Sequence, residues 1–172
     1  MRSFRLLAAL AALTPLGACE APSLKPVTDV ASPATDAMAV VDGYLAGLNA
    51  HDPARAASYY TADVVYFDAS VGVNQVTRDA VQKNVIEAFQ TAVPDCQWTR
   101  DTTRPVITAD GIAYQWTLSG TNTGPFADGT KPTGKHFSFK GATILRLHGD
   151  KVAYEGAYYD AYGFLKQLGL AN

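Results

Sequence analysis

Two aspartates that end strand-like runs are the first residues of this chain to consider for chemistry. Asp68 closes the β-branched and aromatic run Val-Val-Tyr-Phe-Asp. Asp160 closes the last such run, where strand alternation places it on one face with Val152, Tyr154 and Tyr158. A carboxylate among apolar side chains loses hydration, and a desolvated carboxylate can serve as a general base. The alternative is structural, because either aspartate could cap a turn or a following helix.

Two other patterns, a phosphate-binding loop and histidine metal ligands, are not supported by the surrounding residues. Residues 129–135 match the spacing of a phosphate-binding loop, but His136 replaces the required Ser or Thr and Pro132 interrupts the motif. A strand-like run follows where a helix should begin. His51 and His148, like His136, have no metal-ligand spacing. We therefore expect neither a metal site nor a cofactor.

The composition is that of a globular protein without a nucleic-acid surface. The chain has 172 residues, of which 48% are apolar and 10% aromatic, enough for one domain with a sizeable core. Its net charge is −2, and no block of like charges occurs. Nucleic-acid binding needs clustered Lys and Arg. No repeat or low-complexity array is present.

The first residues predict an export signal. Arg2 and Arg5 precede a short apolar run, which is too short to span a bilayer. Leu-Gly-Ala then leads to Cys19 and resembles a bacterial lipobox. The resemblance implies a lipoprotein signal peptide over 1–18, cleavage before Cys19 and lipidation of that residue. The alternative is an ordinary secretory signal that is cut nearby.

A lipidated Cys19 would place the protein in the bacterial cell envelope. Residues 19–35 are rich in proline and poor in apolar side chains, so we expect a flexible tether after the anchor. Glu20 is not the aspartate associated with inner-membrane retention, which favours the periplasmic side of the outer membrane in a diderm. Cys96 is then the one remaining thiol, and we expect it to be buried and inert.

Residues 36–172 predict an α+β domain. A strongly curved, mostly antiparallel sheet, wrapped over about three helices, would leave a cone-shaped fold with an apolar cavity, the usual kind of ligand site. Residues 69–75 are predicted to form a loop, and Gly141 suggests a bulge or a bend. The periodicities predict helices near 34–50, 53–60, 77–93 and 161–168, and strands near 64–68, 95–107, 112–121, 136–148 and 151–160.

The chain resembles SnoaL-like polyketide cyclases of the nuclear transport factor 2-like superfamily. The residues that carry this resemblance are Trp116, the run 119–124, Pro132-Thr133-Gly134-Lys135, Ile144-Leu145-Arg146, Gly149-Asp150-Lys151-Val152, Asp160 and Gln167-Leu168-Gly169. The resemblance covers about residues 36–172. In this branch it implies a catalytic base near the end of the final strand, where Asp160 stands.

The front half is similar to ketosteroid isomerases. The run from Val40 to Tyr44 continues through Asn49 and Asp52, and Asp68 stands 24 residues after Tyr44. This similarity implies that Tyr44 stabilises a developing enolate and that Asp68 shuttles the proton. At the position of that family's second donor, a protonated aspartate, this chain has Thr143. A hydroxyl is a weaker donor than a carboxylic acid.

These resemblances predict a site in the cavity. Its predicted catalytic residues are Asp68, Asp160 and Tyr44, and its predicted lining residues are Tyr66, Trp116, Phe139, Thr143 and Tyr158. The expected activity is cofactor-independent proton transfer next to a carbonyl, as in an isomerase or cyclase, on a small hydrophobic compound. The alternative is a protein that binds such a compound unchanged, which Thr143 favours. The superfamily also implies a homodimer through an exposed sheet face.

Overall fold

The computed structural model describes residues 37–102 and 105–171. The chain divides into Met1–Val30 and Ala31–Asn172, and all described residues belong to the second unit. The predicted signal peptide, Cys19 and the tether lie outside the described residues. No helix in the described part of the chain is long and apolar enough to cross a membrane.

The described residues form helices and strands in an α+β order, as predicted. The helices are α1 Ala37–Asn49, α2 Pro53–Ala57, α3 Arg78–Val81, the π-helical turn η1 Gln82–Glu87, α4 Ala88–Ala92 and α5 Ala161–Leu168. The strands are β1 Tyr60–Asp68, β2 Val73–Val76, β3 Gln97–Arg100, β4 Val106–Ile107, β5 Gly111–Thr121, β6 His136–His148 and β7 Lys151–Tyr159.

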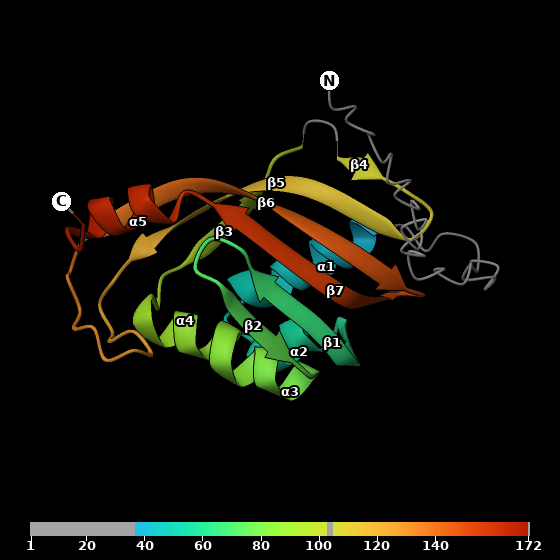
Figure 1. The fold of residues 1–172 in the computed structure, drawn as a ribbon, viewed down its shortest axis with the longest axis horizontal. Coiled ribbons are helices and arrows are strands. Elements are labelled where there is room, and N and C mark those ends of the chain that lie inside the picture. Colours follow the sequence, from blue (N-terminus) through green and yellow to red (C-terminus); the bar gives the residue numbers. More distant parts are fainter. Residues whose placement is uncertain (1–36, 103–104, 172) are drawn as a thin grey trace, which may run out of the picture. The chain divides into compact units, whose positions relative to one another are not determined.

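The strands form one open sheet in the order β2-β1-β7-β6-β5-β3, with β4 beside β5 (Figure 1). Every pair is antiparallel except β1 with β7, which is parallel. Two predictions are corrected here. The predicted loop 69–75 contains the start of an edge strand, β2, and the predicted strand 95–107 is divided between β3 and β4.

Helix α1 covers the inner face of the sheet with the apolar stripe that its sequence predicts. Tyr44, Leu45 and Leu48 are buried. The end of α1 is fixed by Asn49, whose side-chain amide donates to the carbonyl of Trp98 and whose Oδ1 accepts from the Trp98 N–H, both at 2.8 Å. This pair of hydrogen bonds holds α1 against β3.

The helical segment after β2 has a wide turn in its middle. It begins at the predicted cap, Thr77, whose hydroxyl accepts from the Ala80 N–H at 3.3 Å. Over η1 the backbone follows a π-helical path, and the Gln82 side chain donates to Glu87 at 2.9 Å. A π-turn changes which side chains face the sheet and often occurs near functional sites. Figure 1 shows α3 and α4 on the same side of the sheet as α1.

The register aligns inward side chains in rows that cross the sheet. The rows are Ile112–Leu145–Glu155–Tyr66, then Tyr114–Thr143–Ala157–Asp68, then Trp116–Gly141–Tyr159. Because β1 runs parallel to β7, residues from the start and the end of the domain share these rows.

An extra residue in β7 determines which side chains face inward. Arg146 pairs with Tyr154 and Leu147 with Val152, so Ala153 has no partner on β6. Such a bulge reverses the alternation beyond it. Val152 therefore faces inward, and so does Glu155 three residues later.

Cys96 is a free, fully buried thiol. Burial raises the pKa of this thiol to about 12, so it stays protonated at neutral pH and is a poor nucleophile. This agrees with the inert thiol that the sequence predicts.

Gly141 makes room for Trp116. Of the two predicted alternatives, a bulge or a bend, the bulge is wrong, because the register of β5 with β6 is unbroken at this residue. Gly141 pairs with Trp116 across β5 and β6, and a Cβ there would come within 2.3 Å of the indole ring. The indole therefore lies directly over the Gly141 backbone. Its Nε1 donates to the Thr143 hydroxyl at 2.8 Å.

We predict that Gly141→Ala lowers the free energy of unfolding by about 1–3 kcal/mol, because the added methyl group must displace a packed ring. Urea unfolding followed by tryptophan fluorescence measures the change. Ser138→Ala, at an exposed position of the same strand, is the control. Equal stability of the two variants would contradict the assignment of Gly141 to this contact.

Candidate functional site

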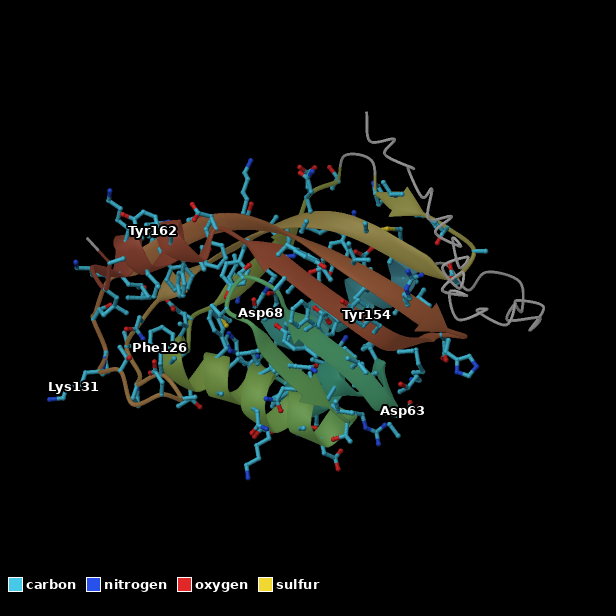
Figure 2. All side chains as sticks on the ribbon, viewed as in Figure 1. Asp63, Asp68, Phe126, Lys131, Tyr154 and Tyr162 are labelled. Carbon is cyan, nitrogen blue, oxygen red and sulfur yellow. The ribbon has the colours of Figure 1, made fainter. Side chains whose placement is uncertain are left out.

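A cavity of about 260 Å³ lies between the inner face of the sheet and the helices α1, η1 and α4. Ten of its 23 lining residues are aromatic, and carboxyl and hydroxyl groups lie on the sheet side. The lining residues used below are Tyr44, Tyr66, Asp68, Tyr114, Trp116, Phe139, Thr143, Glu155 and Tyr159. Figure 2 labels Asp68 at the end of β1 and Phe126, which also lines the cavity, on the loop between β5 and β6.

The structure brings most of the predicted site residues together in this cavity. Asp68 and Tyr66 come from β1, and Tyr44 comes from α1. Trp116 comes from β5. Phe139 and Thr143 come from β6 and line the same space.

Two predicted residues lie elsewhere, and their placement is corrected. Tyr158 is 42% exposed and is not a lining residue. Asp160 is exposed beyond the end of β7 and caps α5, where its Oδ1 accepts from the Gly163 N–H at 2.8 Å. The bulge at Ala153 explains the error, because the prediction assumed unbroken alternation from Val152 onward.

Asp68 is held as an acceptor at the edge of the cavity. Its Oδ1 accepts from the N–H groups of Ser70 and Val71 at 3.0 and 3.3 Å, and its Oδ2 accepts from the Tyr159 hydroxyl at 3.0 Å. The side chain is 9% exposed. Desolvation raises the pKa of Asp68, while the three hydrogen bonds oppose that rise. Three donors favour the ionised form.

Glu155 is a second carboxyl group in the cavity, and sequence reasoning missed it. The residue is 4% exposed. The Tyr60 hydroxyl donates to its Oε2 at 2.5 Å and also lies 2.8 Å from the Tyr44 hydroxyl. A phenol has one proton, so Tyr60 serves one acceptor at a time, and an ionised Glu155 is the stronger acceptor.

Burial makes the Glu155 carboxyl group a weaker acid than usual. Desolvation raises the pKa of Glu155 to about 7, with hydrogen bonds from Tyr60 and Tyr44 opposing the rise and the charge of Asp68 adding to it. The two carboxyl groups therefore differ in environment: Asp68 has two backbone donors, whereas Glu155 has only phenols. Such a difference separates the tasks of base and acid in many enzymes.

Phenol groups supply neutral donors beside the carboxyl groups. The Tyr66 hydroxyl has no hydrogen-bond partner among the described residues, although its side chain is 8% exposed. Burial raises the pKa values of Tyr66 and Tyr114, so both keep their protons. Thr143 already accepts from the Trp116 indole. Tyr66 and Tyr114 therefore each carry a proton that can be donated at the cavity wall, and Thr143 keeps its own hydroxyl proton.

The family model for SnoaL-like polyketide cyclases matches residues 38–168. The chain belongs to this family. The comparison with curated proteins gave no match.

Within the described residues, no three His, Cys, Asp or Glu side chains gather closely enough to hold a metal ion.

Solved structures with low sequence identity share the fold of this SnoaL-like domain. A putative SnoaL-like polyketide cyclase from Jannaschia sp. CCS1 superposes with a TM-score of 0.67 at 13% identity, over 82% of this chain and 99% of that one. IdmH, a putative polyketide cyclase from Streptomyces antibioticus, gives a TM-score of 0.65 at 21% identity, over 78% and 99%.

A third structure carries a bound small molecule. It is a protein with a ketosteroid isomerase-like fold from Catenulispora acidiphila, in complex with trimethylamine, with a TM-score of 0.65 at 20% identity, over 76% of this chain and 92% of that one. At such identities these likenesses establish the nuclear transport factor 2-like fold.

The raised pKa of Glu155 makes stability depend on pH. In the unfolded chain this carboxyl loses its proton near pH 4.5, whereas in the folded protein it keeps the proton up to about pH 7. Stability is therefore lost as the pH rises through this window, because ionisation favours the unfolded state.

We predict that Glu155→Gln removes this loss. Between about pH 5 and about pH 8.5, the free energy of unfolding of the wild type should fall by about 2–3 kcal/mol more than that of the variant. Urea titrations at the two pH values measure the difference. Identical pH dependence in both proteins would show that Glu155 is ionised normally.

Proposed function

We propose that this protein is a cofactor-independent enzyme that moves a proton next to a carbonyl group of a small hydrophobic compound. The observation that carries the proposal is the Asp68 carboxyl group at an apolar cavity, with three hydrogen-bond donors that favour its ionised form, two positions along β1 from the phenol of Tyr66. A general base beside a neutral hydrogen-bond donor suits the formation of an enolate.

Asp68 would remove the proton from the carbon next to the carbonyl, and the C–H electron pair would move into the enolate. The Tyr66 hydroxyl would donate to the developing oxygen anion. Asp68, now protonated, would return the proton to another carbon in an isomerisation. In a cyclisation, the enolate carbon would instead attack a second carbonyl of the same molecule, the C=O electron pair would move to that oxygen, and the resulting alkoxide would take the proton from Asp68.

A binding protein without turnover is the second candidate function. Tyr44 and Thr143, which would be donors by analogy with ketosteroid isomerases, both contact other side chains: Tyr44 contacts Tyr60, and Thr143 accepts from Trp116. The phenols of Tyr66 and Tyr114, which also line the cavity, are further donors for an enolate among the described lining residues. The trimethylamine bound by the Catenulispora protein supports small-molecule binding as such by this fold.

The proposal for location rests on the sequence. A lipid on Cys19 would hold the domain at the envelope membrane through the tether of residues 19–35, on the periplasmic side of the outer membrane if the organism is diderm. This would place the cavity where it meets small molecules that enter the envelope.

We predict that the wild-type domain exchanges the protons next to the carbonyl of 2-tetralone for deuterium in D₂O faster than buffer does. Asp68→Asn should slow the enzymatic exchange by about 10²-fold or more, the usual contribution of a general base. Proton NMR follows the exchange. Asp160→Asn is the matched control, because asparagine also caps helices and Asp160 is at the surface.

Two results would reject this catalytic account. One is equal exchange by wild type and Asp68→Asn. The other is a loss of exchange in Asp160→Asn as large as in Asp68→Asn, which would mean that the exposed aspartate is the base.

The proposed anchor gives a separate prediction. In a bacterial host that processes lipoproteins, wild-type protein should incorporate labelled palmitate and sediment with membranes. Cys19→Ala should do neither and should remain in the soluble fraction, because the acceptor thiol is missing. Labelling of the variant at the wild-type level would contradict lipidation at Cys19.

A further inference from the structure

The cavity contains two carboxyl groups without a positively charged partner. Asp68 and Glu155 both line it, and no lining residue in the described part of the chain is Lys, Arg or His. The ion pairs of the described residues involve neither carboxyl group. Arg100, which lies near Tyr114, is already paired with Asp42 at 2.8 Å. An uncompensated buried carboxylate is costly, so a cationic guest would be stabilised here.

The two carboxyl groups are neighbours on the sheet. Glu155 pairs with Tyr66 across β7 and β1, and Asp68 lies two residues beyond Tyr66 on the same face. Sheet geometry then separates the Asp68 and Glu155 Cα atoms by about 8 Å. A single ammonium group between their side chains would interact with both.

The walls near the carboxyl groups are aromatic. The Trp116 ring lies 5.9 Å from that of Phe139 and 6.3 Å from that of Tyr159, and Phe139 and Tyr159 are 5.1 Å apart. The Tyr159 hydroxyl also donates to Asp68, which joins the aromatic cluster to the carboxylate. Aromatic faces attract alkylated ammonium groups through their quadrupoles, most strongly where water is excluded.

Tyr66 adds a polar group to the lining of the cavity. The Tyr66 side chain is more than nine-tenths buried, lines the cavity, and has no hydrogen-bond partner among the described residues. Its oxygen can accept a hydrogen bond from a protonated amine or donate one to a carbonyl.

We propose that the ligand of this cavity is a small organic cation, a hydrophobic molecule whose ammonium group sits between Glu155 and Asp68 against the ring cluster of Trp116, Phe139 and Tyr159. The inference rests on the cavity being the ligand site of the proposed function, but it does not require turnover. If turnover occurs, the substrate is a hydrophobic ketone that also carries a protonated or quaternary amine.

The experiment compares three ligands of similar shape that differ in charge. Choline carries a quaternary nitrogen, 3,3-dimethylbutan-1-ol has carbon in its place, and 3,3-dimethylbutanoate is an anion. Isothermal titration calorimetry with the wild-type mature domain should give a Kd for choline at least about tenfold lower than for the alcohol, with no binding of the anion.

Variants test whether Asp68 and Glu155 cause the preference for choline over the alcohol. The double variant Asp68→Asn, Glu155→Gln should bind choline and the alcohol equally, whereas Asp160→Asn should keep the wild-type ratio. Binding of the alcohol by the double variant shows that its cavity is intact. If the double variant does not fold, the comparison of the three ligands on the wild type still decides.

Three results would overturn the inference: a wild type that binds the alcohol as tightly as choline, a preference that survives in the double variant, or no binding of any of the three. If the preference is absent while exchange of 2-tetralone depends on Asp68, the proposed reaction stands and only the cationic ligand is rejected.

Discussion

Burial of the Glu155 carboxyl group is the constraint on which the site depends. A carboxyl group loses its hydration in this position, and only the Tyr60 and Tyr44 hydroxyls replace it. Those phenols come from the start of β1 and from α1, whereas Glu155 comes from β7 near the end of the domain. The parallel pairing of β1 with β7 and the packing of α1 on the sheet therefore hold one hydrogen-bonded group together.

The parallel pairing of β1 with β7 also positions other residues of the cavity. Asp68 follows Tyr66 on β1 and takes its third donor from Tyr159 on β7. Gly141 lets the Trp116 ring lie over β6, so that the indole reaches Thr143 and forms a wall. The acidic side chains thus lie among aromatic rings, and their electrostatic effect on a guest is stronger than it would be in water.

Much of the fold was predictable from local patterns. The alternation in β5, the bounds of β6 and α5, and the caps Thr77 and Asp160 follow from side-chain periodicity and from hydroxyl and carboxylate acceptors before free N–H groups. Edge strand β2 was missed because it is short and mostly exposed. An exposed strand has no apolar alternation to reveal it.

The site was predictable only in part. Tyr44 and Asp68 were found through resemblance and line the cavity. Glu155 was missed because one extra residue, Ala153, reverses the faces of β7, and no side-chain type in that run signals a bulge. The same error placed Tyr158 and Asp160 in the cavity. A lone glutamate between Tyr154 and Gly156 in an otherwise apolar and aromatic strand was the available clue.

The central claim is that the Glu155 carboxyl group is buried with little hydration. The titration of this group tests the claim most directly. The chain has three glutamates, so carbon-13 NMR of protein labelled at the glutamate side-chain carboxyl gives few signals, and Glu155→Gln assigns one of them. The account predicts that the assigned signal titrates with a midpoint near pH 7. A midpoint below about pH 5 for that signal would mean a hydrated carboxylate, and would contradict the account.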